Sequence, residues 1–166
     1  MAKLRRDRTE RVDEPARIGV LNGPNLNLLG SREPHHYGTR TLAEIESLLR
    51  ERAGADGVTL TFFQSNDEGE IVDWVQANTG AVDGWLVNAA ALTHTSVALR
   101  DALDGSGRPF VEVHLSNVFA REPFRHTSLL SDLAIGVIAG FRASSYLFGL
   151  EALIRHLRGS AGAGAE

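Results

Sequence analysis

The amino-acid sequence predicts an α/β protein in which helices cover both faces of a parallel sheet. Five short apolar segments alternate with segments of helical period, and such alternation favours a parallel sheet. Polar segments follow the predicted strands, as is typical where a ligand binds beyond the carboxyl ends of a parallel sheet. The length of 166 residues, with 43% hydrophobic residues, suits a single domain with its own core.

The predicted strands are short runs rich in apolar side chains. Runs of this length between turn residues are typical of strands that are buried on both faces of a sheet. In chain order the strands are expected at Arg17–Leu21, Val58–Phe63, Gly84–Val87, Pro109–Val113 and Ala134–Ala139.

The predicted helices lie between and after these strands. Thr41 and Glu44 form the capping-box pattern that starts a helix. Ile71, Trp74 and Val75 recur at helical spacing and indicate the buried face of a second helix. The four helices are expected at Thr41–Ala53, Glu68–Asn78, Thr95–Asp104 and Ser144–Leu157.

The predicted domain covers residues 17–158. Residues 1–16 are polar and lack an apolar core, so we expect a disordered tail there and not a secretory signal. Residues 159–166 are small and glycine-rich, which predicts a second flexible tail. The longest apolar runs are too short to span a membrane, and the sequence fits a cytoplasmic protein.

Composition excludes several classes of chemistry. The net charge is −4, and acidic and basic residues are interspersed along the chain without a long basic stripe. We therefore expect no nucleic-acid partner. The chain has no cysteine, which excludes disulfides and thiolate chemistry. Lys3 is the only lysine and lies in the predicted tail, so neither a Schiff base nor a phosphate-binding P-loop lysine is available in the domain.

The segment Asn22–Gly38 is too long for an ordinary connection between a strand and a helix. It places Arg32 and Tyr37 five residues apart, and a nearby guanidinium favours the phenolate that a tyrosine general base needs. The alternative is a solvated arginine and an ordinary half-buried tyrosine. The loop alone favours that alternative.

The segment Val87–Ser96 places Asn88 at a strand end and His94 near the start of a helix. A helix N-terminus attracts anions, so a substrate carboxylate or hydroxyl could bind there. In the equally weighted alternative, Thr93 or Thr95 caps the helix and His94 is a surface residue.

Glu112 and His114 alternate along a strand, so both side chains point to the same side near its carboxyl end. A carboxylate beside an imidazole fixes its tautomer and favours its charged form, which suits a general acid. Arg121 and Arg125 follow in an irregular loop, where a guanidinium can hold a carboxylate or hydroxyls. A buried structural ion pair is the alternative for Glu112 and His114.

Metal binding is not expected. His94, His114 and His126 are candidate zinc ligands, because histidine is the commonest side-chain ligand of that ion. The sequence lacks the tight ligand spacing of known zinc motifs, and Glu112 is better explained as the partner of His114.

Four segments together resemble the type II 3-dehydroquinate dehydratases from about Arg17 to Leu157. They read NGPNLNLLGSREPHHYG, QSNDEGEIVDW, NAAALTHTSVALRDAL and EVHLSNVFAREPFRH, in this order. The resemblance implies a flavodoxin-like fold with strand order 2-1-3-4-5 and a homododecamer built of trimers. It also implies dehydration of 3-dehydroquinate to 3-dehydroshikimate in the shikimate pathway of aromatic amino-acid biosynthesis, or in its catabolic counterpart. No metal or organic cofactor takes part in that family.

The resemblance also implies roles for single residues. Tyr37 is the base that removes the C2 proton to give an enolate, and Arg32 stabilises its phenolate. Asn25 holds the enolate oxygen through an ordered water. His114 is the acid that protonates the departing C1 hydroxyl in an anti elimination, and Glu112 supports it.

Six further positions match substrate-binding residues of that family. They would hold the carboxylate and the hydroxyls of 3-dehydroquinate, and the residue matching Asp101 reaches the site of a neighbouring subunit. The six are Asn88, His94, Asp101, Arg125 and the backbone amides of Leu115 and Ser116.

Three departures from the usual family sequence leave the pocket lining open. Ala89–Leu92 replaces a frequent Pro-Gly-Ala-Tyr, while Phe119 and Thr127 stand where histidines are common. Two other functions stay open as well. One is a flavodoxin-like module that binds a nucleotide or flavin without turnover, although the first loop lacks a glycine-rich phosphate cradle. The other is a catalytically inactive homologue retained for assembly.

Overall fold

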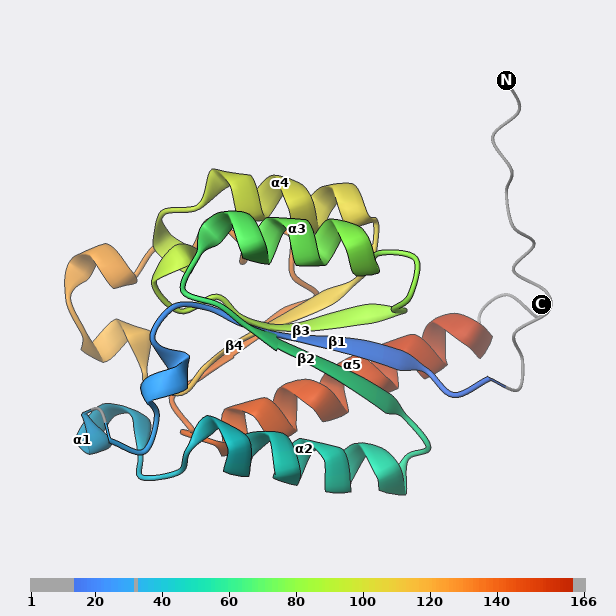
Figure 1. The fold of residues 1–166 in the computed structure, drawn as a ribbon, viewed down its shortest axis with the longest axis horizontal. Coiled ribbons are helices and arrows are strands. Elements are labelled where there is room, and N and C mark those ends of the chain that lie inside the picture. The colour runs from blue at the N-terminus through green and yellow to red at the C-terminus, as the bar shows by residue number, and fades with distance from the viewer. Residues whose placement is uncertain (1–13, 32, 163–166) are drawn as a thin grey trace.

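The computed structural model describes residues 14–31 and 33–162 and contains a five-stranded parallel sheet of order β2-β1-β3-β4-β5 (Figure 1). The predicted flavodoxin-like fold and strand order are confirmed. Both ends of every strand lie within two residues of the predicted bounds. The strands are β1 (Arg17–Asn22), β2 (Thr59–Gln64), β3 (Gly84–Asn88), β4 (Phe110–His114) and β5 (Gly136–Ala139).

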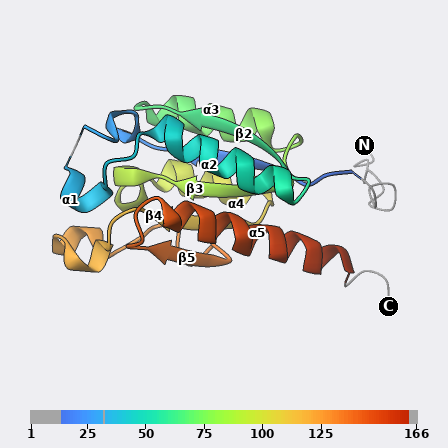
Figure 2. The ribbon, with the colours of Figure 1, turned by 90° about the horizontal axis from the view of Figure 1, so that it is seen from below.

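Helices cover both faces of the sheet and bury a separate apolar cluster on each face. Helices α3 (Glu68–Asn78) and α4 (Val97–Ser106) lie on one face, and α2 (Leu42–Ala55) and α5 (Ser144–Gly162) lie on the other (Figures 1 and 2). The cluster under α3 and α4 includes Trp85, whereas the cluster under α2 and α5 includes Tyr146. Burial of apolar surface in these two clusters holds the three layers together.

The capping box predicted for Thr41 and Glu44 is confirmed. The Glu44 backbone N–H donates to Thr41 Oγ1 at 3.2 Å, and the Thr41 N–H donates to Glu44 Oε2 at 2.7 Å. Hydrogen bonds from the Thr41 backbone and hydroxyl hold the pKa of Glu44 below its ordinary value. Helix α2 therefore begins at Leu42.

Helix α4 begins later than predicted. Ser96 is its N-cap and accepts a hydrogen bond from the Leu99 N–H at 2.8 Å, so neither Thr93 nor Thr95 caps it. The preceding residues form a separate 3-10 helix, η3 (Ala90–His94). The prediction that Thr93 or Thr95 caps the helix was therefore wrong, because the chain makes this extra turn before α4 starts.

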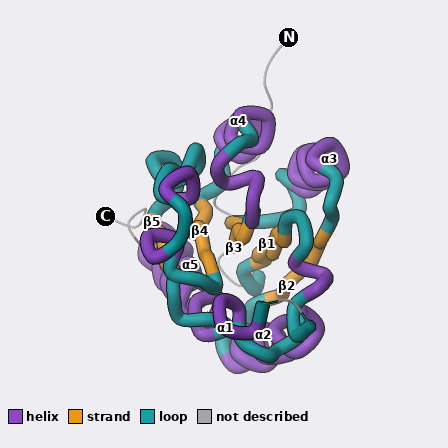
Figure 3. The backbone as a smooth tube through the Cα atoms, turned by 90° about the vertical axis from the view of Figure 1, so that its left-hand side faces the viewer, coloured by secondary structure: helices purple, strands orange, loops and turns teal. Residues whose placement is uncertain are grey.

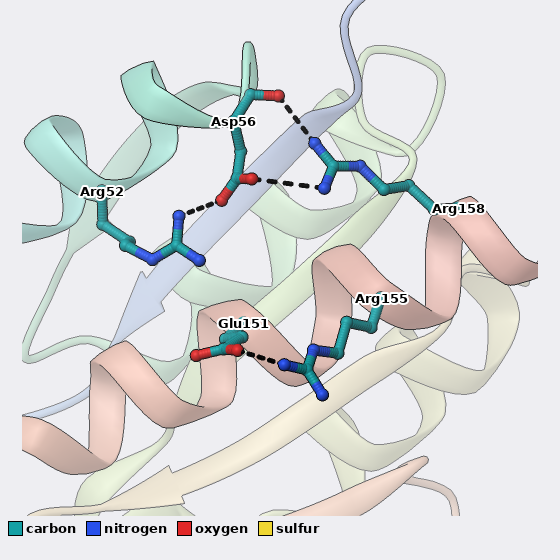
Figure 4. A network of polar contacts seen from close by, with 5 residues as sticks. All are labelled: Arg52, Asp56, Glu151, Arg155 and Arg158. Atoms are coloured by element: carbon teal, nitrogen blue, oxygen red, sulfur yellow. Dashed lines mark hydrogen bonds and ion pairs between the residues drawn. The ribbon is translucent and has the colours of Figure 1, made fainter.

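Helix α5 extends beyond its predicted end at Leu157 to Gly162, so residues 159–162 of the predicted tail are helical. Arg158 holds this last part of the helix to the end of α2. Its Nη1 lies 3.2 Å from Asp56 Oδ1, and its Nη2 donates to the Asp56 carbonyl oxygen at 2.9 Å (Figure 4). Arg52 pairs with the same carboxylate. Tertiary contacts thus continue the helix into a glycine-rich sequence.

Two glycines bring backbone segments close together. A β-carbon on Gly149 of α5 would come within 2.5 Å of Val113 Cγ1, and one on Gly23 would come within 2.3 Å of the Ala89 carbonyl oxygen. The Gly23 N–H also donates to the Asn88 carbonyl oxygen at 2.8 Å. The loops that follow β1 and β3 therefore lie against each other at the carboxyl edge of the sheet.

Residues 1–13, 32 and 163–166 lie outside the described structure. Most of the predicted N-terminal tail (residues 1–16), the last four residues and Arg32 are therefore not described, whereas the Ala16 carbonyl oxygen accepts from the Thr59 N–H at 2.9 Å. Within the described ranges, no helix has both the length and the apolar character that crossing a bilayer requires.

Candidate active site

The loops after β1, β3 and β4 meet at the carboxyl edge of the sheet (Figure 3). A cavity opens between these loops. Its walls contain eight of the eleven predicted site residues. These eight are Asn25, Tyr37, Asn88, His94, His114, Leu115, Ser116 and Arg125. The tertiary structure therefore brings together side chains from three separate loops, as expected for a ligand site on a parallel sheet.

Asn25 enters the cavity from the loop after β1. Its φ of 68° lies in the left-handed region, which asparagine tolerates better than most residues. The Asn25 N–H donates to Asn66 Oδ1 at 2.8 Å, and Gln64 Nε2 donates to the same oxygen at 3.2 Å. The segment after β2 thus fixes the backbone that presents Asn25.

Tyr37 lies at the end of α1 (Pro34–Tyr37), a short helix within the long loop after β1. Arg121 Nη1 donates to the Tyr37 hydroxyl at 2.7 Å, and Arg121 Cζ lies 5.4 Å from the centroid of the tyrosine ring. The Arg121 side chain is only 8% exposed. A nearly buried guanidinium therefore donates directly to the phenol oxygen of Tyr37.

Arg121 was not predicted as the partner of Tyr37. The sequence indicated Arg32 for that position, and Arg32 lies outside the described residues. One signal was present: the tripeptide Arg-Glu-Pro occurs twice, at residues 32–34 and 121–123, and a proline begins a short helix in both places. The repeat marks a second arginine in a matching local setting, but it does not say what that arginine contacts.

Glu112 and His114 form the predicted pair at the end of β4. His114 Nε2 lies 2.6 Å from Glu112 Oε1, and the two side chains are 8% and 1% exposed. The Ser128 hydroxyl donates to the other carboxylate oxygen, Oε2, at 2.9 Å. Glu112 is therefore satisfied on both oxygens, as a buried carboxylate must be, and it supports His114 from behind the cavity wall.

His94 faces His114 across the cavity. The ring centroids are 6.5 Å apart and the planes differ by 15°. His94 Nδ1 lies 2.7 Å from the Thr127 carbonyl oxygen. A carbonyl only accepts, so His94 carries a proton on Nδ1 and leaves Nε2 for a ligand.

Asn88 belongs to a buried hydrogen-bond chain that the sequence did not suggest. Asn88 Nδ2 donates to the Tyr146 hydroxyl at 2.9 Å, and that hydroxyl donates to Asn22 Oδ1 at 2.6 Å. Burial raises the pKa of Tyr146, so the phenol stays protonated. The Ala90 N–H donates to Asn88 Oδ1 at 3.2 Å, which fixes the orientation of the amide and leaves one Nδ2 hydrogen for a ligand.

Arg125 borders the cavity beside Arg121. Its Nε donates to Glu122 Oε2 at 2.8 Å, and its guanidinium carbon lies 5.0 Å from the centroid of the Phe124 ring. Because one of its five donors is used by Glu122, most of the guanidinium can still contact a ligand.

Asp101 does not line the cavity. It is exposed on α4, next to Arg100, which pairs with Asp132. The site of a single chain therefore lacks this predicted residue.

No group of three or more His, Asp and Glu side chains in the described ranges is arranged to hold a metal ion. His126 points instead to the Arg121 carbonyl oxygen, with Nε2 at 3.0 Å.

The family model for dehydroquinase class II matches residues 16–154, the whole region that carries the sheet and the cavity. The chain belongs to this family.

Curated relatives and solved structures agree with this assignment. The chain is 62% identical to the 3-dehydroquinate dehydratase of Azorhizobium caulinodans over 136 residues, which are 82% of this chain and 92% of that protein. It is 59% identical to the 3-dehydroquinate dehydratase of Vibrio parahaemolyticus over 143 residues, 86% of this chain and 96% of the relative. The type II dehydroquinase structure from Butyrivibrio crossotus superposes with a TM-score of 0.81 at 37% identity, covering 84% of this chain and 97% of that one.

The three departures of this class II dehydroquinase have different structural consequences. Ala90 adopts a left-handed φ of 51°, where a glycine would carry no steric penalty. Thr127 contributes its backbone carbonyl to His94, so the identity of its side chain is not used there. Phe119 is exposed, and its ring centroid lies 5.8 Å from that of His126.

Proposed function

We propose that this class II dehydroquinase is a hydro-lyase that converts 3-dehydroquinate to 3-dehydroshikimate in the cytoplasm, as a step of the shikimate pathway. One observation carries the proposal: a tyrosine and a histidine line the same cavity, and each is held by a buried charged partner. Tyr37 is held by Arg121, and His114 is held by Glu112. An elimination needs such a base and acid around one substrate.

In the proposed first step the Tyr37 phenolate removes the C2 proton of the substrate. The electron pair of the C–H bond moves to the neighbouring ketone and gives an enolate. Arg121 would stabilise the phenolate, together with Arg32, which is not among the described residues. Asn25 would hold the enolate oxygen through an ordered water, and one preorganised donor at such an oxygen is worth on the order of 3 kcal/mol.

In the second step the enolate collapses to a C1–C2 double bond and the C1 hydroxyl leaves. His114 would supply the proton that turns this hydroxyl into water. Because Nε2 is engaged by Glu112, the proton would come from Nδ1 of the imidazolium. The base and the acid act on opposite faces of the substrate, which gives an anti elimination.

The remaining polar groups of the cavity would bind the substrate. Arg125 and the backbone amides of Leu115 and Ser116 suit its carboxylate, while Asn88 and His94 offer an amide hydrogen and a free ring nitrogen for its hydroxyls. All these groups are uncharged or positively charged, which suits an anionic substrate.

We further propose a homododecamer of trimers in which Asp101 serves the cavity of a neighbouring chain. Its exposure on α4, away from its own cavity, supports this role. Sedimentation should give the mass of twelve chains. Asp101→Ala and Tyr37→Phe should each be nearly inactive alone, and their coexpression should restore part of the activity. If Asp101 serves its own cavity, the mixed particles gain nothing.

The test of the activity is an ultraviolet assay for the conjugated enone product. The purified protein should turn over 3-dehydroquinate without added metal, equally well with a chelator present, and borohydride should trap no adduct because Lys3 is the only lysine. Tyr37→Phe should lower kcat at least roughly a hundredfold while substrate still binds. Absence of turnover in the wild-type protein, or a yellow protein with bound flavin, would contradict the proposal.

A further inference from the structure

The hydroxyl of Ser128 makes every hydrogen bond of which a hydroxyl is capable. It accepts from the backbone N–H groups of Leu130 at 3.0 Å and Ser131 at 3.1 Å. These two bonds occupy both lone pairs, so the single proton is left to donate to Glu112 Oε2 at 2.9 Å. The direction of each hydrogen bond at this hydroxyl is therefore determined.

This arrangement also fixes the carboxylate of Glu112. Oε2 accepts from Ser128, and Oε1 faces His114 Nε2 at 2.6 Å. Because an ionised carboxylate only accepts, His114 must carry a proton on Nε2. The backbone turn at residues 128–131 thus sets the tautomer of His114 through two successive hydrogen bonds.

The segment that carries Ser128 is itself held in place. The Leu129 N–H donates to the Thr93 carbonyl oxygen at 2.8 Å, and Arg100 Nη1 donates to the Leu129 carbonyl oxygen at 2.6 Å. Arg100 also binds both carboxylate oxygens of Asp132, at 2.5 and 2.9 Å, and lowers the pKa of that group. Ser128 is therefore anchored to α4 and not only to its own turn.

We infer that Ser128 is a positioning residue for the proposed acid His114 and acts through Glu112. The inference rests on the proposed function. Ser128 does not line the cavity, so its effect belongs to proton delivery and not to substrate binding. Loss of its hydroxyl leaves Glu112 Oε2 without its donor and frees the carboxylate to rotate away from the imidazole.

The test compares Ser128→Ala with a matched control, Ser106→Ala. The Ser106 hydroxyl also makes three hydrogen bonds, to the Leu103 carbonyl and from the Arg108 N–H and Trp85 Nε1, at the opposite edge of the sheet. Ser128→Ala should lower kcat about tenfold, the size expected for one hydrogen bond to a charged group, with KM changed less than about twofold. Ser106→Ala should leave both constants unchanged, and Ser128→Thr should restore kcat.

Two further measurements separate positioning from a general loss of structure. In a His114→Ala background, Ser128→Ala should cause no additional loss of turnover. In NMR spectra, the resonance of the His114 Nε2 proton should shift in Ser128→Ala and stay in place in Ser106→Ala. The inference is wrong if Ser128→Ala keeps its kcat, if threonine does not restore it, or if the resonance does not move. Because the resonance is read without substrate, it tests Ser128 even if the wild-type protein has no dehydratase activity.

Discussion

Arg121 Nη1 lies 2.7 Å from the hydroxyl of Tyr37, although 84 residues separate the two in the chain. Arg121 comes from the loop after β4, and Tyr37 ends the short helix in the loop after β1. Their contact exists because β3 lies between these strands in a parallel sheet, which puts both loops at the same edge. The same nitrogen also donates to Ser116 Oγ at 3.4 Å, so Arg121 links the loop after β1 to the residues that follow β4.

The first prediction concerns this contact. Arg121→Gln removes the charged donor to the Tyr37 hydroxyl, which stabilises the phenolate in the proposed mechanism, so kcat should fall by about tenfold or more. In a Tyr37→Phe background the same substitution should cost little, because its target is gone. Arg155→Gln, which removes an exposed arginine that pairs with Glu151 on α5, is the control and should leave kcat unchanged. Equal losses from Arg121→Gln with and without Tyr37 would show that Arg121 acts elsewhere.

A second prediction follows from the saturated hydroxyl of Ser128. In Glu112→Gln the amide oxygen must accept from Ser128, because Ser128 can only donate there. The amide NH₂ then faces His114 Nε2, which becomes an acceptor, so the imidazole takes the opposite tautomer. We expect kcat to fall by roughly a hundredfold or more, as when a catalytic histidine is held in the wrong tautomer. Steady-state kinetics tests this, and Glu151→Gln on the surface of α5 serves as the neutral comparison. A Glu112→Gln variant with normal kcat would contradict the tautomer argument.

Ala90 provides a third prediction, about stability. A left-handed backbone costs a non-glycine residue roughly 1–2 kcal/mol, and the greater freedom of glycine in the unfolded chain offsets part of the gain. Ala90→Gly should therefore raise the free energy of unfolding by about 0.5–1 kcal/mol in urea titrations. Ala91→Gly, one residue further in the same 3-10 helix and without a positive φ, should lower it instead. A loss of stability in Ala90→Gly would mean that the strain is absent.

A fourth prediction concerns the buried phenol of Tyr146. Tyr146→Phe should destabilise the fold by about 1–3 kcal/mol near neutral pH, because the amides of Asn22 and Asn88 lose their partner. It should also raise KM, since Asn88 borders the cavity.

The same substitution should change how stability depends on pH. Burial raises the pKa of Tyr146 in the folded state above its value of about 10 in the unfolded chain. Below pH 10 or so both states keep the proton. Above it only the unfolded state releases the proton, so the wild-type protein loses up to about 1.4 kcal/mol of stability per pH unit from this group. The stability difference between wild type and Tyr146→Phe should therefore shrink above that pH. A difference that stays constant to pH 11.5 or so would show that the phenol is not protected.

Local signals predicted the elements of this fold well. The Thr41 capping box, the apolar strand runs and the face of Ile71 and Val75 act over a few residues, and the structure confirms each of them. The end of α5 was missed because Arg158 and Asp56, on different helices, stabilise a sequence with poor helical propensity.

Parts of the site could also be predicted from the sequence. Glu112 and His114 could be paired because a strand places every second side chain on the same side. The carboxyl-edge rule for parallel sheets placed the polar loops at one edge, the resemblance named the residues in them, and eight of those residues line one cavity. The chemical roles of all eleven residues stay predictions; Arg32 also lies outside the described residues, and the role of Asp101 depends on a neighbouring chain.

The sequence by itself determined the strand order, through the family resemblance, and the local pairs along each element. Only the tertiary structure decided which distant groups meet: Arg121 with Tyr37, Ser128 with Glu112, and Tyr146 between two strand-end asparagines. The physical reason is the difference in sequence separation between the interacting residues. Backbone periodicity and capping depend on neighbours within a few residues, whereas a hydrogen bond between loops depends on which strands separate them and how closely the layers pack.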